Sequence, residues 1–266
     1  MGFTSRAKCG IFLSTFIERM KTIETMNTAV VEEGVATTPA LSPEQAALYR
    51  EMIAAGIAVG RKKSRTNPKM DGFILSYSRG VVTFDIMQTV ACIDRAAAFL
   101  KQLIEEKRSV IVLGSQPTAR DLVLEFATKH GFFHVTNRWL GGILTNFNTI
   151  SKRITYFTKL KADKAAGELL KYTKKEQLDF DRLISNMTVS FAGLEGIAAL
   201  PAAVFVVDAA AHEIAVREAR RLKIPLIAIM NSDSDPDGVE YPIPANDNSR
   251  SSLLWIFKRL NEKIGA

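Results

Sequence analysis

Residues 110–135 read VIVLGSQPTARDLVLEFATKHGFFHV, and this stretch decides the fold. The uninterrupted apolar run at 110–113 is typical of a strand that is buried on both faces. After a short turn, the pattern predicts a helix at 118–129 that ends before Gly131, and then a second short strand at 133–135. A strand, a helix and a strand in so short a stretch indicate a parallel βαβ unit.

Strands alternate with helices from Asp85 onward, and two strands about the turn at 78–80 come before this alternation. Asp85 is placed to cap a helix that reaches about residue 106. Ser42 and Pro43 predict the start of an earlier helix. This helix is expected to run to about residue 57, with its termination near Gly60. We predict further strands at 73–77, 81–84, 203–207, 226–229 and 239–243, and further helices at 211–222 and 247–264. The sequence therefore predicts an α/β fold, in which helices cover both faces of a parallel sheet.

No strand is evident between residues 135 and 203. Thr145 is expected to start a helix that reaches about residue 161, and the capping box from Thr173 to Glu176 predicts a second helix. Two such helices joined by a lysine-rich turn indicate an antiparallel hairpin. We predict three parts: a flexible leader at 1–41, a sheet domain at 42–136 and 197–266, and an inserted helical hairpin at 137–196.

The leader differs in composition from the rest of the chain, since its first 25 residues mix basic with large apolar side chains. Three interpretations stay open: a flexible tail, upstream sequence translated from a wrongly chosen start, and a weak targeting segment. We favour the first two, and we expect a cytoplasmic rather than an organellar protein.

The charge is distributed unevenly along the chain. A net charge of +7 and a pI of about 9.4 fit any basic soluble protein. However, residues 126–162 contain no Asp or Glu, and residues 61–69 hold five basic side chains and no acid. A polyanion lying on these surfaces would explain the absence of carboxylates, although a solvated lysine face is the usual origin of such a run. Our candidates for RNA contact are Arg61, Lys62, Lys63, Arg65, Asn67, Lys69, Asn137, Arg138, Thr145, Asn146, Lys152 and Arg153.

The stretch from Asn137 to Asn146 supports two compatible interpretations. Trp139 is expected to fill the junction between sheet and hairpin, while Arg138, Asn137 and the helix start at Thr145 face outward. We expect Thr145 to cap the following helix, whose free backbone N–H groups would accept a phosphate.

Motifs for catalysis, cofactors and metals are missing from the sequence. The turn after residue 113 is neither GxGxxG nor a P-loop, so a nucleotide-dependent or sugar-phosphate-dependent enzyme is the weaker rival. The run from Asp233 to Gly238 begins like a calcium loop but has Pro244 where a glutamate is required, and we interpret its acids as turn formers. We predict no catalytic residue, no cofactor and no metal site. A peripheral membrane protein that uses its leader is a third hypothesis.

Several motifs, in this order, resemble a known family: the second protein of the bacterial-type small ribosomal subunit, the S-two family. The resemblance covers about residues 42–264. Its motifs are Asn67–Met70, Asn137–Gly142, Leu144–Phe147, Thr173–Glu176, Leu200-Pro201, Phe205–Asp208, Glu218-Ala219, Asn231–Gly238, Ile243-Pro244 and Asn246-Asp247. The chain departs from the family pattern at Ala58 and Arg61, where histidines are usual, and at His212, where an acid is usual.

The resemblance implies a flavodoxin-like sheet with a protruding helical hairpin and a structural, non-enzymatic role. It also implies binding to small-subunit ribosomal RNA and to other small-subunit proteins. In bacteria, the large messenger-binding protein S-one is a further expected neighbour. A small-molecule substrate and a membrane are not expected as partners.

Overall fold

The computed structural model describes residues 43–265 and divides the chain into two units, residues 1–54 and 55–266. The described part of the first unit is helix α2 (Pro43–Ala54). Our prediction of a longer helix was wrong at its end, because Gly56 has a φ of +74° and a right-handed helix does not continue through it. The predicted leader, residues 1–41, lies outside the described residues.

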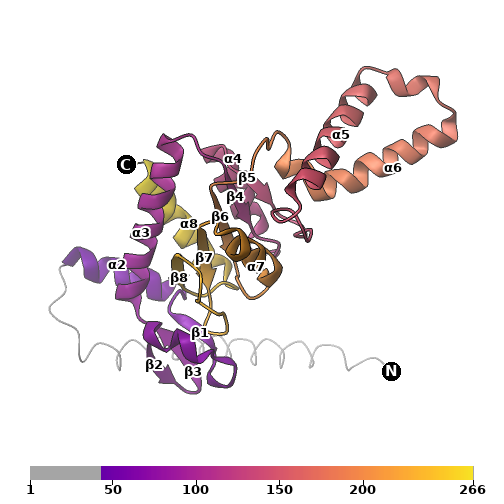
Figure 1. Ribbon diagram of the computed structural model, residues 1–266. Coiled ribbons are helices and arrows are strands. Elements are labelled where there is room, and N and C mark those ends of the chain that lie inside the picture. Colours follow the sequence, from indigo (N-terminus) through magenta and orange to yellow (C-terminus); the bar gives the residue numbers. More distant parts are fainter. Residues whose placement is uncertain (1–42, 266) are drawn as a thin grey trace, which may run out of the picture. The chain divides into compact units, whose positions relative to one another are not determined.

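A five-stranded parallel sheet forms the centre of the second unit (Figure 1). The strands lie in the order β5-β4-β6-β7-β8, which is the flavodoxin-like order. Every residue of β4, β6 and β7 is buried, as their continuous apolar sequences predicted. The α/β fold is thus confirmed. The strands are β4 (Val110–Leu113), β5 (Phe133–Val135), β6 (Ala203–Val207), β7 (Leu226–Met230) and β8 (Tyr241–Pro244).

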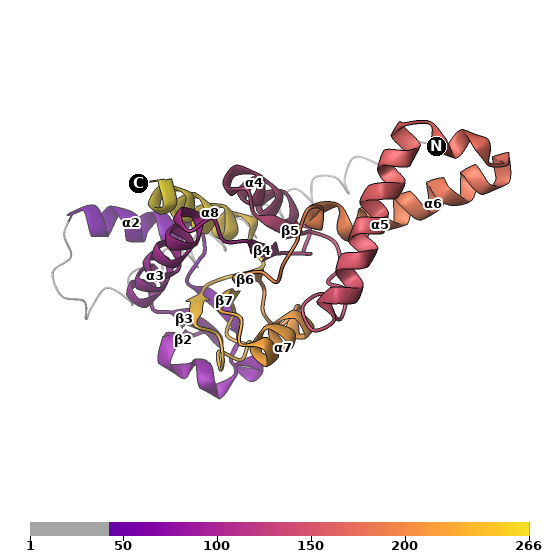
Figure 2. The ribbon, with the colours of Figure 1, turned by 45° about the horizontal axis from the view of Figure 1, so that its top comes forward.

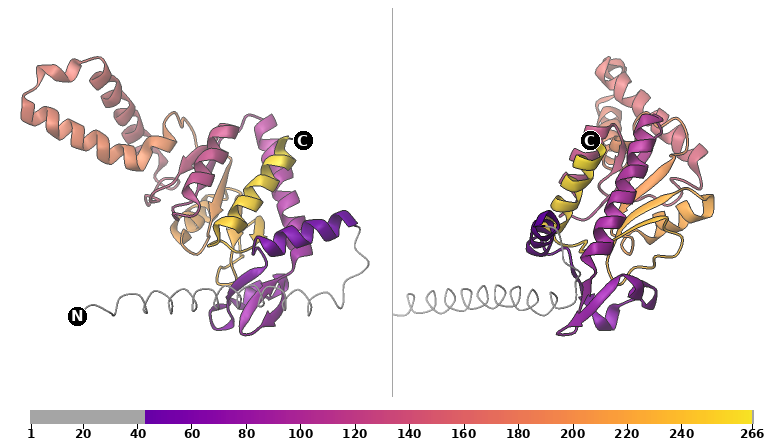
Figure 3. Two further views of the ribbon diagram at one scale, coloured as in Figure 1. Left: turned by 180° about the vertical axis from the view of Figure 1, so that it is seen from behind. Right: turned by 90° about the vertical axis from the view of Figure 1, so that its left-hand side faces the viewer.

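Helices cover both faces of this sheet. Helices α3 (Ile86–Glu105), α4 (Arg120–His130) and α8 (Arg250–Gly265) lie on one face, and α7 (Glu213–Leu222) lies on the other (Figures 2 and 3). From β4 the chain moves to β5, and from β6 it moves to β7 in the opposite direction along the sheet. Because such crossovers are right-handed, α4 and α7 are placed on opposite faces.

The start and end signals of these helices act as expected. The Asp85 carboxylate accepts a hydrogen bond from the Met87 N–H at 2.9 Å and caps α3. Gly131 ends α4 in the left-handed conformation, with a φ of +69°. The sequence therefore marks the start of α3 and the end of α4 correctly through local capping residues.

A second, antiparallel sheet precedes the parallel one. Its strands β1 (Val59–Lys62), β2 (Ile74–Ser78) and β3 (Val81–Phe84) lie in the order β1-β3-β2. Strands β2 and β3 confirm the two strands predicted at 73–77 and 81–84, and they pair antiparallel. We did not predict β1, because we placed the end of the first helix near Gly60 and assigned no strand to the basic residues that follow it. Two short 3₁₀ helices, η1 (Lys63–Arg65) and η2 (Pro68–Phe73), connect β1 to β2.

Helices α5 (Phe147–Ala165) and α6 (Lys174–Phe191) follow one another between β5 and β6, and they reach away from the sheet (Figure 1). The 3₁₀ helices η3 (Glu168–Lys171) and η4 (Ala192–Leu194) lie after α5 and after α6. The Thr173 capping box is present. Our prediction that Thr145 caps α5 was wrong, since Asn146 is the N-cap residue. The division of residues 137–196 from the sheet domain as a separate insertion stays a prediction.

Candidate nucleic-acid interface

The basic segment, residues 61–69, forms the end of β1 together with η1 and the start of η2. Lys62, Lys63 and Arg65 are exposed, and none of them forms an ion pair with any residue of 43–265. The Lys63 ammonium lies 4.9 Å from the centre of the Tyr77 ring, which holds it beside β2. Arg61, Lys62 and Arg65 line a shallow hollow of about 280 Å³. This surface offers unneutralised positive charge to an anion.

Arg61 differs from its neighbours because its side chain is bound within the fold. Its backbone N–H donates to the Ser232 hydroxyl at 3.0 Å. Its guanidinium lies 3.4 Å from a carboxylate oxygen of Asp233 and 3.4 Å from one of Asp247. Arg61 therefore ties β1 to the loops that follow β7 and β8.

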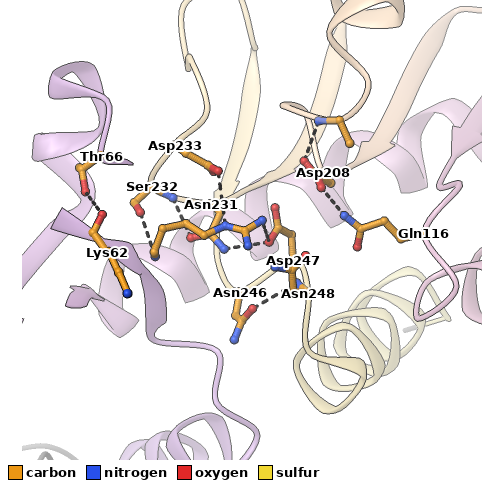
Figure 4. A network of polar contacts seen from close by, with 12 residues as sticks. Lys62, Thr66, Gln116, Asp208, Asn231, Ser232, Asp233, Asn246, Asp247 and Asn248 are labelled. Carbon is orange, nitrogen blue, oxygen red and sulfur yellow. Dashed lines mark hydrogen bonds and ion pairs between the residues drawn. The ribbon is translucent and has the colours of Figure 1, made fainter. Parts of the chain in front are cut away.

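The Asp247 carboxylate belongs to a buried polar network at the carboxyl ends of the parallel strands (Figure 4). Asn231 donates to it at 2.8 Å. Burial raises the pKa of Asp247 to about 6, and the negative charge of Asp208 adds to this rise. Asp208 in turn accepts hydrogen bonds from the Gln116 side chain and from the Ala211 N–H. In a doubly wound fold this edge of the sheet is the usual ligand site, and here the protein's own side chains occupy it.

A serine and a histidine also meet at this edge. The Ser115 N–H donates to Nε2 of His212 at 3.2 Å, and the Ser115 hydroxyl lies 3.4 Å from the same nitrogen. Burial lowers the pKa of His212, which keeps the ring neutral near pH 7. The neutral ring accepts the Ser115 N–H hydrogen bond, so the Ser115–His212 contact is explained by its role in holding this turn.

Asn67 and Lys69 are also engaged within the fold. The Asn67 side chain accepts from the Lys69 N–H at 3.1 Å and caps η2. The Lys69 ammonium lies 3.2 Å from a carboxylate oxygen of Asp235 and also binds Asp237. The hydrogen bonds to Asp237 and Asp235 raise the pKa of Lys69. The acids that we interpreted as turn formers thus neutralise one of the predicted RNA-contact residues.

The second predicted patch centres on Trp139, which is buried in the core as expected. Its indole N–H donates to the Glu218 carboxylate at 3.1 Å. The N–H groups of Gly142, Leu144 and Thr145 donate to the same carboxylate at 2.8, 3.0 and 3.2 Å. These donors lie before Asn146, whereas we expected the N–H groups of the helix start to bind a phosphate, and that expectation stays a prediction.

The Glu218 carboxylate is ionised in this position. Burial alone would raise its pKa, but the hydrogen bonds from Gly142, Trp139, Thr145 and Leu144 lower the pKa below its usual value. We did not predict a role for Glu218 in the site. A usable signal was present, since Glu218 lies between Val216 and Ala219 on the buried side of α7.

Other predicted residues around Trp139 divide into anchored and exposed groups. The Asn137 side chain donates to the Val189 carbonyl at 2.9 Å and is therefore anchored to α6. Arg138 and Asn146 are exposed. Lys152 and Arg153 are exposed on α5, and neither they nor Arg138 form an ion pair with the described residues. Among the predicted RNA-contact residues, six cations thus have no ion pair within residues 43–265: Lys62, Lys63, Arg65, Arg138, Lys152 and Arg153.

The sequence of this chain matches a family model, described as ribosomal protein S2, over residues 52–265. The chain belongs to the ribosomal protein S2 family. The match includes the basic segment, the Trp139 loop and Glu218, so both candidate patches lie inside the family region.

Individual S2 proteins share more than a third of their aligned residues with this chain. The small ribosomal subunit protein uS2 of Petrotoga mobilis is 37% identical over 215 residues, which are 81% of this chain and 75% of that protein. The uS2 protein of Salinispora tropica is 39% identical over 79% of this chain and 71% of its own length. That of Dictyoglomus thermophilum is 36% identical over 82% of this chain and 88% of its own length.

Among the side chains of the described residues, no group of three or more His, Cys, Asp and Glu is arranged to hold a metal ion. None of the helices in residues 43–265 combines the length and the apolar character that crossing a membrane requires.

Proposed function

We propose that this protein is a structural constituent of the small ribosomal subunit, and that it binds small-subunit ribosomal RNA mainly through phosphate contacts. Lys62, Lys63 and Arg65 form the first contact surface. Arg138, with Lys152 and Arg153 on α5, forms the second. Lysine and arginine that contact phosphates release counterions from the RNA, which gives strong but salt-sensitive binding.

The observation that carries this proposal is the contrast between paired and unpaired cations. Arg61 and Lys69 are the two ends of the basic segment, and both are neutralised by carboxylates of the same chain. Lys62, Lys63 and Arg65 lie between them, exposed and without an ion pair among the described residues. RNA phosphates bind unpaired cations, and these three lie together in a segment, residues 61–69, that contains no acid.

The remaining parts of the proposal concern partners and location. We propose that the protein performs no catalysis, since its buried polar groups at the sheet edge bond to one another rather than line an open pocket. We further propose other small-subunit proteins, including the messenger-binding protein S-one in bacteria, as neighbours. The location that goes with this role is the ribosome of a bacterial cytoplasm.

Charge reversal of the basic segment tests the proposal. A variant with Lys62→Glu, Lys63→Glu and Arg65→Glu is expressed in cells together with the tagged wild-type protein. We expect the variant to be depleted from the small-subunit peak of a sucrose gradient, because three repulsive charges replace three phosphate partners.

A matched variant controls for the change in net charge. Lys107, Arg108 and Lys223 are exposed and lie before β4 and β7, at the opposite end of the parallel strands. Their reversal to glutamate should leave incorporation intact. Equal incorporation of both variants and the wild type would show that the basic segment does not hold the protein on the subunit.

A further inference from the structure

The Glu218 carboxylate occupies a position that is built for an anion. Five hydrogen bonds converge on its two oxygens: two on Oε1 and three on Oε2. Three of the donors are backbone N–H groups of the loop that leads into α5, and a fourth is an indole N–H. Consecutive amide groups that point at one centre are the arrangement with which proteins bind phosphate.

The loop depends on this anion for its conformation. Gly142 has a φ of +93°, which is the left-handed region that favours glycine. Its N–H points at Oε1 of Glu218, at 2.8 Å. The Leu144 N–H is buried with the carboxylate and has it as its hydrogen-bond acceptor. Without the carboxylate, buried donors would lose their acceptor, and the loop would have to move to find another.

The same carboxylate determines how Arg138 is presented. Trp139, on one side of Arg138, is bound to Glu218, and Asn137, on the other side, is bound to the Val189 carbonyl of α6. The backbone of Arg138 is thus anchored on both sides while its side chain is exposed. The third anchored position is Thr145, directly before the α5 N-cap, since both its N–H and its hydroxyl donate to Glu218.

We propose that Glu218 is a positioning residue for RNA contact. It acts as an internal anion in place of a phosphate, holds residues 139–145 in one conformation, and so presents Arg138 and the start of α5 to the RNA. The loop is therefore closed to an outside phosphate, and its RNA contacts are made by side chains. The link to RNA rests on the proposed function, whereas the role of the internal anion does not.

Anion rescue tests the first part. The thermal unfolding of Glu218→Ala is followed in sodium sulfate and in sodium chloride of equal ionic strength. We expect Glu218→Ala to melt lower than the wild type in chloride. We expect sulfate to restore part of the loss, because sulfate can enter the vacated position and bind the same donors.

Sulfate also stabilises proteins in general, so a matched control is required. Glu213→Ala removes a carboxylate from the same helix, but Glu213 is exposed and pairs with Arg217 at the surface. We expect the gain from sulfate to be larger for Glu218→Ala than for Glu213→Ala and the wild type. Equal gains in all three proteins would overturn the internal-anion role.

Glu218→Gln provides a second route if the alanine variant does not fold. Glutamine keeps the size of the side chain but turns one oxygen into a donor, which then faces N–H groups. The NH2 group replaces either Oε1 or Oε2, so we expect either the Gly142 amide or the Leu144 and Thr145 amides to exchange hydrogen about tenfold faster, as for the loss of one hydrogen bond. Unchanged exchange at all three amides would contradict the proposal.

A double-mutant cycle tests the link to RNA. Arg138→Ala should weaken binding to purified small-subunit RNA in the wild-type background and have a smaller effect in the Glu218→Gln background. A purely structural role for Glu218 predicts additive effects of the two changes. If the effects are additive while sulfate rescues Glu218→Ala, the positioning role is refuted and the internal-anion role is kept. If Arg138→Ala has no effect in either background, RNA contact by Arg138 is refuted.

Discussion

The Arg61 guanidinium lies 3.4 Å from Oδ1 of Asp247, a carboxylate that is fully buried and 186 residues further along the chain. Arg61 and Asp247 therefore depend on each other, since the arginine supplies the positive charge beside a carboxylate that has no access to water. This relationship separates Arg61 from the exposed cations Lys62 and Arg65 beside it.

Arg61→Ala should destabilise the fold by about 3 kcal/mol at pH 7, because it leaves the Asp247 charge without its cationic partner. Lys62→Ala, one residue away, should change the free energy of unfolding by less than about 0.5 kcal/mol, because Lys62 is exposed and has no ion pair in the described structure. Urea denaturation of both variants measures the difference. Similar values for the two would show that Arg61 is an ordinary surface residue.

The stability of the protein should depend on pH through Asp247. Its pKa is raised from 3.8 to about 6. Between these values the folded protein holds a proton that the unfolded chain releases. The free energy of unfolding that protonation of Asp247 contributes is therefore fully present below pH 4, and it is lost as the pH rises through 6.

Asp247→Asn removes this titration while Arg61, Asn231, Asp208 and Asp233 stay around the site. The difference in free energy of unfolding between wild type and variant should fall by about 3 kcal/mol from pH 4 to pH 7. Urea titrations at several pH values measure it, and titrations that occur in both proteins cancel in the difference. A difference that rises with pH would mean that the Asp247 pKa is lowered in the folded state.

Gly193→Ala should be strongly destabilising. A Cβ atom at this position would lie 2.1 Å from the His134 carbonyl oxygen, so η4 would have to move away from β5. We expect a loss of about 3 kcal/mol or more, and a lower melting temperature. Gly141→Ala is the control, because a Cβ there would have no neighbour within 4 Å. If Gly141→Ala lowers the melting temperature as much, the close approach at Gly193 is not the cause.

Trp139→Phe should cost about 1 to 2 kcal/mol, because it removes one donor to the Glu218 carboxylate and leaves space in the core. Trp255→Phe on α8 should cost less, since Trp255 is only partly buried and its indole N–H has no acceptor among the described residues. Thermal unfolding compares the two variants. A larger effect at Trp255 would contradict the importance of the Trp139–Glu218 contact.

Local sequence patterns predicted most of the sheet domain. The apolar run at Val110 and the cap at Asp85 depend only on neighbouring residues, and both were correct. Strand β1 was missed because its basic residues, including Arg61, are held by partners that follow β7 and β8. Pairing across such a distance leaves no periodic signal in a single sequence.

The candidate site was less predictable for the same reason. Charge clustering drew attention to residues 61–69 as a whole, but it did not distinguish Lys69, which is neutralised by Asp235, from Arg65, which is free. The sequence likewise showed a helix start near Thr145 but not the carboxylate of Glu218 that binds the loop before it. The sequence identified candidate residues by their charge and type, whereas the long-range contacts in the structure show which of them are engaged within the fold.

The salt dependence of RNA binding tests whether Lys62, Lys63 and Arg65 contact phosphates of the small-subunit RNA. The affinity of the wild type and of a variant with Lys62→Ala, Lys63→Ala and Arg65→Ala is measured for purified small-subunit RNA over a range of salt concentrations. Each lost phosphate contact should reduce the slope of log affinity against log salt by about 0.7 to 0.9, so the triple variant should have a slope shallower by about 2 to 3. Two parallel lines would contradict the claim that these three residues bind RNA phosphates.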